Sequence, residues 1–250
     1  MQFDRINNKF IHNLGSYFVS NNNPGEALKL NANQLKDLKH LHLEGPFITA
    51  KVIASFLNAA PNLENLTIYD CVKLGEGLLN LKPNQLNKLL TLDMRGSLIT
   101  SKQLISLFSA APNLETIDYS LGQSDDKNVH KLFYANQLSH LKKFIFPSAL
   151  TIKQLEAILI AAPNLESINL AAFTQLGDTS LHLKSTQLLH LKKIYTRGSS
   201  ITADQLAKII GAAPNLETID INNCEKLGDV LLNTDGHPLN KLAVSFKVCK

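Results

Sequence analysis

Tryptophan is absent from the sequence, and cysteine and methionine are scarce, with three and two copies among 250 residues. The chain also has no large excess of positive or negative charge, because its 25 basic and 21 acidic residues give a formal net charge of +4. So small and mixed a charge does not by itself indicate nucleic acid or an anionic membrane as the partner. Hydrophobic residues make up 44% of the chain, which is enough for a buried core, so we expect a folded globular protein.

Long apolar runs are missing as well. No segment approaches the roughly 18 apolar residues of a membrane-spanning helix. The start, MQFDRINNKFIHNLG, has neither an apolar h-region nor a small-residue cleavage site. We therefore expect no membrane span and no Sec-type signal peptide, and we predict a cytoplasmic protein.

Motifs of catalysis and cofactor binding are equally absent from the sequence. The chain contains no nucleophile elbow, no phosphate-binding G-x-x-x-x-G-K, no HExxH and no paired C-x-x-C. The sequence therefore predicts a protein that is not an enzyme and that binds no cofactor and no metal.

What the chain does contain is an internal repeat. The hexapeptide AAPNLE occurs four times, with its proline at Pro61, Pro112, Pro163 and Pro214. The intervals 112 − 61, 163 − 112 and 214 − 163 all equal 51 residues. This constant interval indicates a repeat architecture.

Each copy of AAPNLE is preceded by the pattern of a short helix. A threonine is followed by apolar residues at the i, i+3, i+4 and i+7 spacing of a helix buried on one side. The four threonines are Thr49, Thr100, Thr151 and Thr202. In three copies a glutamine follows three residues later, which is the capping-box spacing, at Gln103, Gln154 and Gln205. We therefore predict four helices that begin at the threonines and are ended by the prolines.

A strand pattern, L-x-x-L-x-L, follows each proline and appears again midway between the copies. Its leading leucines mark nine coils, at positions 38, 63, 89, 114, 141, 165, 191, 216 and 239. Neighbouring coils are separated by 23 (239 − 216) to 27 (141 − 114) residues, inside the range of about 20 to 29 for leucine-rich repeats. The sequence therefore predicts an α/β fold, a right-handed leucine-rich repeat solenoid. It would carry a curved parallel sheet on the concave face and helices and turns on the convex face.

The repeat array is predicted to fill most of the chain. We assign residues 38–250 to the nine coils and a C-terminal tail, and residues 1–37 to an N-terminal cap with one degenerate repeat. The segment GQSDDKNVHK (122–131) departs from the Leu-Gly-acidic turn of its siblings, which indicates a surface insertion or, alternatively, a contact site. Cys71 and Cys224 differ by 153, three times 51, so these two thiols should be about 29 Å apart, buried and reduced.

Two copies carry a resemblance to a known family. AAPNLENLTIYDCVKLGE (59–76) and AAPNLETIDINNCEKLGD (212–229) resemble the cysteine-containing leucine-rich repeat found behind F-boxes, C-P-x-L-x-x-L-x-L-x-x-C-x-x-L-T-D. Alanine replaces the first cysteine, glycine replaces the threonine, and the start is too short for an F-box. Repeat-only proteins of this kind resemble effectors that intracellular bacteria introduce into host cells. The resemblance implies a protein-binding effector, translocated without a Sec signal, whose partner is a eukaryotic host protein.

The residues between the leucines of each strand point to the sheet surface, and curved repeat arrays bind partners mostly there. Tyrosine and arginine are the most frequent anchors of binding. We nominate nine partner-binding residues: His42, Tyr69, Asp93, Arg95, Asp118, Lys143, Lys193, Tyr195 and Arg197. We expect a monomer that holds a protein partner of unknown identity against these positions; ordinary solvated sheet residues are the alternative.

Three other interpretations of this surface stay open. HLHLE (40–44) offers metal ligands at i, i+2 and i+4, but no fourth ligand is visible. Asp93 and Asp118 should be neighbours, like the paired carboxylates of acid/base catalysis, yet Asp118 recurs as Asp220 and therefore looks like a repeat residue. The lysines and arginines could contact phosphates, although aspartates are interleaved with them. Binding of nucleic acid or another anionic ligand is the first alternative, and catalysis the last.

Overall fold

The computed structural model describes residues 16–20, 30–75, 77–119, 138–145, 151–171, 173, 177, 179–227 and 243–245. The chain divides into two compact units, Met1–Asp126 (unit 1) and Lys127–Lys250 (unit 2). The atypical segment 122–131 and the tail 246–250 lie outside the described residues.

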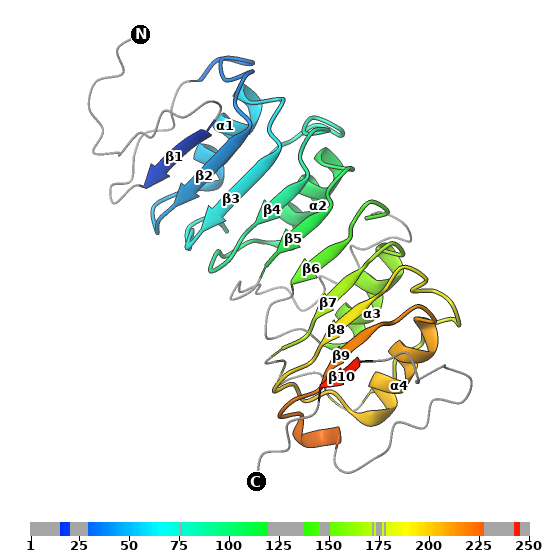
Figure 1. The fold of residues 1–250 in the computed structure, drawn as a ribbon. Helices are drawn as coiled ribbons and strands as arrows, with labels where there is room; N and C mark the ends of the chain where they lie inside the picture. The colour runs from blue at the N-terminus through cyan, green and yellow to red at the C-terminus, as the bar shows by residue number, and fades with distance from the viewer. Residues whose placement is uncertain are drawn as a thin grey trace. The chain divides into compact units, whose positions relative to one another are not determined.

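The described residues of unit 1 form five strands that pair in sequence order, all of them parallel. These strands are β1 (Ser16–Ser20), β2 (His40–Glu44), β3 (Asn65–Tyr69), β4 (Thr91–Asp93) and β5 (Thr116–Asp118). Its helices are α1 (Ala50–Ala59) and α2 (Ser101–Ala110), which lie on one side of the strands (Figure 1). The first strand, β1, falls within the segment assigned to the N-terminal cap and pairs with β2 in the same parallel manner.

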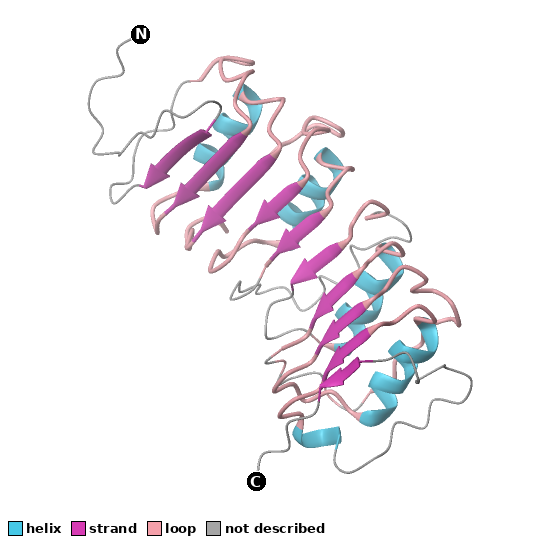
Figure 2. Cartoon of the chain, in the orientation of Figure 1, coloured by secondary structure: helices cyan, strands magenta, loops and turns pink. Residues whose placement is uncertain are grey.

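Unit 2 repeats this arrangement. Its parallel strands are β6 (Lys143–Ile145), β7 (Ser167–Asn169), β8 (Lys193–Tyr195), β9 (Thr218–Asp220) and β10 (Ala243–Ser245). Its helices are α3 (Ile152–Ala161), α4 (Ala203–Ala212) and a 3-10 helix, η2 (Glu225–Leu227). In each unit α-helices cover one side of the strands, and no helix among the described residues lies on the other side (Figure 2). Parallel strands that alternate with helices or turns confirm the predicted α/β leucine-rich repeat solenoid.

The predicted register of the last coil is wrong. Ala243 pairs with Thr218, and Ser245 pairs with Asp220. The alignment that started from the leucine at position 239 had placed Ala243 opposite Asp220, two residues away. The observed pairing separates β9 and β10 by 25 residues (243 − 218), which agrees with the other coils better than the predicted interval of 23.

The four helices begin and end as predicted. Thr49, Thr100, Thr151 and Thr202 are the N-caps. The complete capping box forms in α2, α3 and α4, where the threonine hydroxyl accepts from the glutamine N–H and the glutamine side chain accepts from the threonine N–H. Each helix closes on the second alanine of AAPNLE, one residue before the proline. Such caps contribute roughly 1 kcal/mol each to helix stability.

The core lies between the strands and the helices of each unit. Leucine and isoleucine positions of the strand pattern, such as Leu66, Ile68 and Leu92, have no exposed surface. Alternate strand residues are half-buried or exposed, so the burial of β3 reads half-buried, buried, half-buried, buried, half-buried. Burial of each large apolar side chain contributes roughly 1.5–3 kcal/mol, and packing therefore holds these ten-residue helices in place.

The asparagine of AAPNLE connects neighbouring coils, a role that the sequence pattern did not reveal. In all four copies its Nδ2 donates to a backbone carbonyl of the preceding coil. The pairs are Asn62 with Lys36 (3.0 Å), Asn113 with Asn87 (2.9 Å), Asn164 with Ser139 (2.7 Å) and Asn215 with Leu189 (2.8 Å). The asparagine of the hexapeptide therefore has a structural role, as its apolar residues do.

Candidate functional site

The side of the strands that carries no helix is called the strand face below. The structure places all nine nominated residues on strands or in the turn that directly follows a strand. Unit 1 holds His42, Tyr69, Asp93, Arg95 and Asp118, and unit 2 holds Lys143, Lys193, Tyr195 and Arg197. None of the nine is buried: Arg95, Lys143, Lys193 and Arg197 are exposed and the rest are half-buried.

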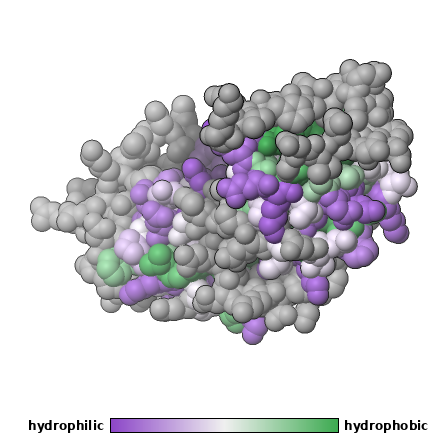
Figure 3. Space-filling model, turned by 90° about the horizontal axis from the view of Figure 1, so that it is seen from below, coloured by the Kyte–Doolittle hydropathy of each residue, from purple (hydrophilic) through white to green (hydrophobic). Residues whose placement is uncertain are grey.

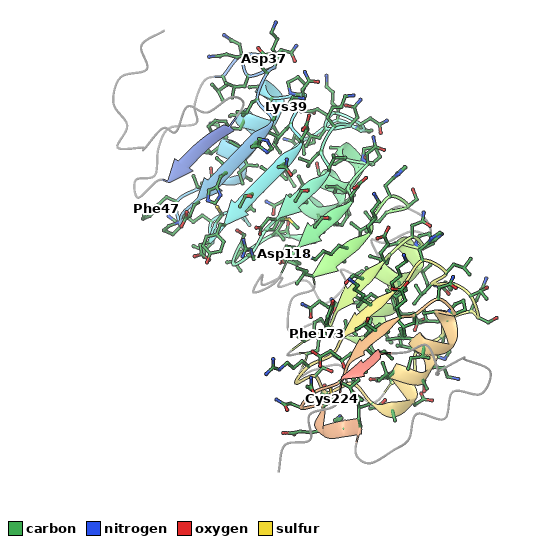
Figure 4. All side chains as sticks on the ribbon, in the orientation of Figure 1. Asp37, Lys39, Phe47, Asp118, Phe173 and Cys224 are labelled. Atoms are coloured by element: carbon green, nitrogen blue, oxygen red, sulfur yellow. The ribbon has the colours of Figure 1, made fainter. Side chains whose placement is uncertain are left out.

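Four of the nominated residues in unit 1 come together around one guanidinium. Arg95 Nε is 3.0 Å from both carboxylate oxygens of Asp93, and Nη2 is 2.7 Å from Oδ2. Asp118, opposite Asp93 on the next strand, lies 3.8 Å from Arg95 Nε. The guanidinium carbon stands 5.7 Å from the ring centre of Tyr69, within cation–π range. We call Tyr69, Asp93, Arg95 and Asp118 the Arg95 cluster; Asp118 is labelled in Figure 4.

The cluster is an ion-pair network. The hydrogen bond to Asp93 and the charge of that carboxylate raise the pKa of Arg95. Asp93 Oδ1 also accepts the backbone N–H of Arg95 at 3.1 Å, which closes a turn at the end of β4. Both carboxylates that had suggested acid/base catalysis therefore contact Arg95, an arrangement typical of structural salt bridges.

The same turn recurs along the strand face of unit 2. Asn169 Oδ1 accepts the N–H of Ala171 at 2.9 Å, and Asp220 Oδ1 accepts the N–H of Asn222 at 3.1 Å. The side chain of Asn222 donates to the same Asp220 oxygen at 2.7 Å. The acidic and amide residues of this row thus stabilise the strand ends.

The histidines of HLHLE contact different partners. His42 Nε2 is 3.3 Å from Glu44 Oε2, whereas His40 Nδ1 is 2.8 Å from the side-chain nitrogen of Asn65. Within the described part of the chain, no three His, Cys, Asp or Glu side chains gather closely enough to hold a metal ion. The geometry therefore gives the metal interpretation no support at this strand.

In unit 2 the nominated cations form no salt bridge with any acidic residue that the structure describes. Lys143 and Lys193 flank Ser167 across neighbouring strands, and Tyr195 follows Lys193 on β8. Arg197 lies in the turn after β8. Among the described residues, none of Lys143, Lys193 and Arg197 forms a salt bridge.

The two cysteines in the described residues are free, as expected. Cys71 is buried, and burial raises the pKa of its thiol to about 12. Cys224, labelled in Figure 4, was predicted to be buried but is half-buried. Its sulfur lies 2.9 Å from the carbonyl oxygen of Thr196. Cys249 lies outside the described residues.

The strand pattern missed surface residues in the turns, because it selects only strand positions. In unit 1 the amine of Lys73 stands 5.1 Å from the ring centre of Phe47, and Val72 beside it is 46% exposed. In unit 2 a shallow hollow on the α4 side is lined by Ser180, Leu181, His182, Leu183, Lys184, Asp204 and Lys208. Where described residues are visible in Figure 3, hydrophilic side chains predominate and apolar ones form small separate patches.

The comparison with family models agrees with the repeat fold. The chain matches the family model described as "At1g61320/AtMIF1, LRR domain" over residues 27–224. No curated protein matches it. One similar solved structure is an internalin (inlF) from Listeria monocytogenes str. 4b F2365. It is 12% identical, with a TM-score of 0.33, and the match covers 95% of this chain and 87% of that chain.

The helices found in the described segments are all too short or too polar to cross a membrane. Leucine-rich repeat domains generally serve protein–protein interaction and are typically not enzymes. The matched region, 198 residues from 27 to 224 (224 − 27 + 1), is well over half of the 250 residues. The chain therefore belongs to the leucine-rich repeat family described as At1g61320/AtMIF1, LRR domain.

Proposed function

We propose that the chain binds a partner protein on its strand face, through the Arg95 cluster in unit 1 and through Lys193, Tyr195 and Arg197 in unit 2. The observation that carries the proposal is the Arg95 cluster itself. Its arginine side chain is exposed, at 46%, and is held by Asp93 and Tyr69 before any partner binds. An arginine that is already ordered loses less side-chain entropy on binding, which favours it as an anchor.

The composition of this face favours a protein over nucleic acid. Phosphate binding depends on cations that are not matched by nearby anions. In unit 1 two carboxylates, Asp93 and Asp118, stand beside the single guanidinium of Arg95. The cluster therefore carries no surplus positive charge, and its ring and hydrogen-bonding groups suit a mixed protein surface.

Affinity capture tests the proposal. A Tyr69→Ala/Arg95→Ala variant and a Lys193→Glu/Arg197→Glu variant each alter one strand face, and Lys153→Glu on α3 serves as a control because that exposed lysine lies on the helix side. Partners captured from a eukaryotic cytosolic lysate should disappear with the strand-face variants and remain with the control. Equal capture by all variants, with unchanged circular dichroism, would place the binding surface elsewhere.

We extend the proposal to the place of action: the partner is a protein of a eukaryotic host cell, and the chain acts there as an effector. The support is the resemblance of AAPNLENLTIYDCVKLGE (59–76) to eukaryote-type repeats in repeat-only effectors. Capture should then yield a strand-face-dependent partner from eukaryotic cytosol and none from a bacterial lysate. A partner found only in the bacterial lysate would contradict this part alone.

A further inference from the structure

The internal duplication places two arginines in equivalent positions with different surroundings. Arg95 and Arg197 are separated by 102 residues (197 − 95), or two intervals of 51, and each follows the last residue of its strand by two positions. Arg95 is held by Asp93 two residues earlier. The residue equivalent to Asp93 in unit 2 is Tyr195, so Arg197 has no carboxylate at that position.

The other two residues that contact Arg95 also have no equivalent contact with Arg197 among the described residues of unit 2. Ala171 stands where Tyr69 stands in unit 1, which removes the ring over the guanidinium. Asp220 corresponds to Asp118, but its Oδ1 accepts two hydrogen bonds from Asn222. No salt bridge joins Asp220 to Arg197 in the described part of unit 2. As far as the described residues show, the repeat position that is neutralised within unit 1 is therefore a cation without a salt bridge in unit 2.

Two lysines on the strand face of unit 2 add positive charge on two of its strands. Lys143 and Lys193 both pair with Ser167, so they occupy the same row two strands apart, a separation of about 10 Å. Both side chains are exposed. Arg197 lies beyond Tyr195 at the end of the same strand as Lys193.

We propose that the strand face of unit 2 recognises an acidic segment of the partner protein, with carboxylates bound by Arg197, Lys193 and Lys143. The inference rests on the proposed function, since it names the chemistry of the partner for one of the two faces. In a segment with the polyproline II conformation, acidic residues three positions apart lie on the same side and are separated by about 9 Å, which is close to the spacing of the two lysines. The guanidinium of Arg197 suits bidentate binding of a further carboxylate.

An acidic peptide fits this face better than nucleic acid does. Three cations are too few for the continuous backbone contact on which nucleic-acid affinity depends. Exposed Glu166 and Glu217 stand at the start of β7 and β9 and would repel a regular row of phosphates.

The test uses the full chain and three labelled probes: an oligoglutamate of about ten residues, an oligolysine of the same length and an oligothymidylate of the same length. Binding is followed by fluorescence anisotropy at about 25 and 150 mM salt, because exposed ion pairs weaken as screening increases. The variants are Arg197→Gln and Tyr195→Asp, and the second reproduces in unit 2 the pair that neutralises Arg95. Lys153→Gln on α3 is the control with the same loss of charge, and Tyr195→Asn removes the ring without adding a carboxylate.

The wild type should bind oligoglutamate at low salt and not oligolysine. Arg197→Gln and Tyr195→Asp should each weaken that binding about two- to fivefold, the effect of one exposed ion pair. Lys153→Gln should stay within about twofold, and Tyr195→Asn should weaken binding less than Tyr195→Asp does, because it adds no carboxylate. The inference is overturned if the wild type does not bind oligoglutamate, or if Arg197→Gln and Lys153→Gln have the same effect. Tighter, Arg197-dependent binding of oligothymidylate would overturn it in favour of nucleic acid.

The two proposals fail separately. If a captured partner requires the strand face but is indifferent to Tyr195→Asp and to salt, protein binding holds and the acidic-segment inference is wrong. If oligoglutamate binds as expected but no partner requires the strand face, the inference holds for the surface and the proposed function is wrong.

Discussion

Replacing Gln103 by leucine is expected to destabilise unit 1 by about 2–4 kcal/mol, because three hydrogen bonds of a fully buried amide are lost. Its Oε1 accepts the N–H of Thr100 at 2.9 Å. Its Nε2 donates to the carbonyls of Leu74 at 2.6 Å and Gly77 at 2.8 Å. Leucine has a similar volume, so little cavity forms, and the cost comes from polar backbone groups left without partners at about 1 kcal/mol each.

Urea unfolding followed by circular dichroism measures the effect as a lower midpoint. Because the chain has two compact units, hydrogen exchange of the α2 amides should accompany it, so that the loss is assigned to unit 1 and not to the whole chain. Lys102→Leu is the matched control, since it places leucine at the neighbouring exposed position of the same helix. A loss below about 0.5 kcal/mol for Gln103→Leu, or an equal loss for the control, would refute the argument that this amide joins α2 to the preceding coil.

Three further predictions concern single positions. Thr186 has a φ of 63°, which is unfavourable for a β-branched residue, so Thr186→Asn should raise the free energy of unfolding by about 0.5–1 kcal/mol in urea denaturation; no gain would contradict this. Gly96 and Gly198 have φ values of 70° and 67°, so alanine should cost about 1 kcal/mol at either position. Thermal unfolding should show a larger loss of stability for Gly96→Ala than for Gly198→Ala. The added Cβ at position 96 would lie 1.9 Å from the side chain of Asp70, whereas nothing lies within 4 Å of the one at position 198. Equal losses of stability would refute the role of this contact. The raised pKa of Cys71, about 12, favours the thiol in the folded protein, so its contribution to stability is present below the thiol's ordinary pKa and falls as the pH rises toward 12. At pH 8 its peptide should stay unlabelled by iodoacetamide until the protein is denatured, as read by mass spectrometry.

The fold could be predicted from the sequence because its signals are local and repeat. Each helix is predicted by a threonine cap and an apolar stripe, and each strand is predicted by alternating apolar and polar residues, which are present in almost every coil. The prediction was wrong at β10, where the segment LNKLAVSF (239–246) has apolar residues at every second position from 242 to 246. A shift by two residues leaves the same side of the strand toward the core, so alternation cannot fix the register, and pairing with β9 decides it.

The positions of the candidate site were also predictable, since alternation alone decides which side chains leave the core. Their partners were not. Equivalent arginines, Arg95 and Arg197, look alike in the repeat pattern, yet Arg95 is held by a carboxylate and a ring, whereas no described residue forms a salt bridge with Arg197. Asp93 is near Arg95 in the sequence, but Tyr69 and Asp118 are brought alongside by neighbouring strands, from about 25 positions away in the chain.

The sequence by itself determined the repeat length, the helix caps, the core positions and the set of residues on the strand face, because each follows from short-range periodicity. Only the tertiary structure decided which polar groups meet. The four asparagines of AAPNLE donate to the preceding coil, Gln103 donates to two carbonyls there, and Arg95 contacts two carboxylates, whereas no described residue forms a salt bridge with Arg197. Hydrogen bonds and ion pairs require atoms within about 3–4 Å, and stacking the coils is what brings atoms so far apart in the chain to that distance.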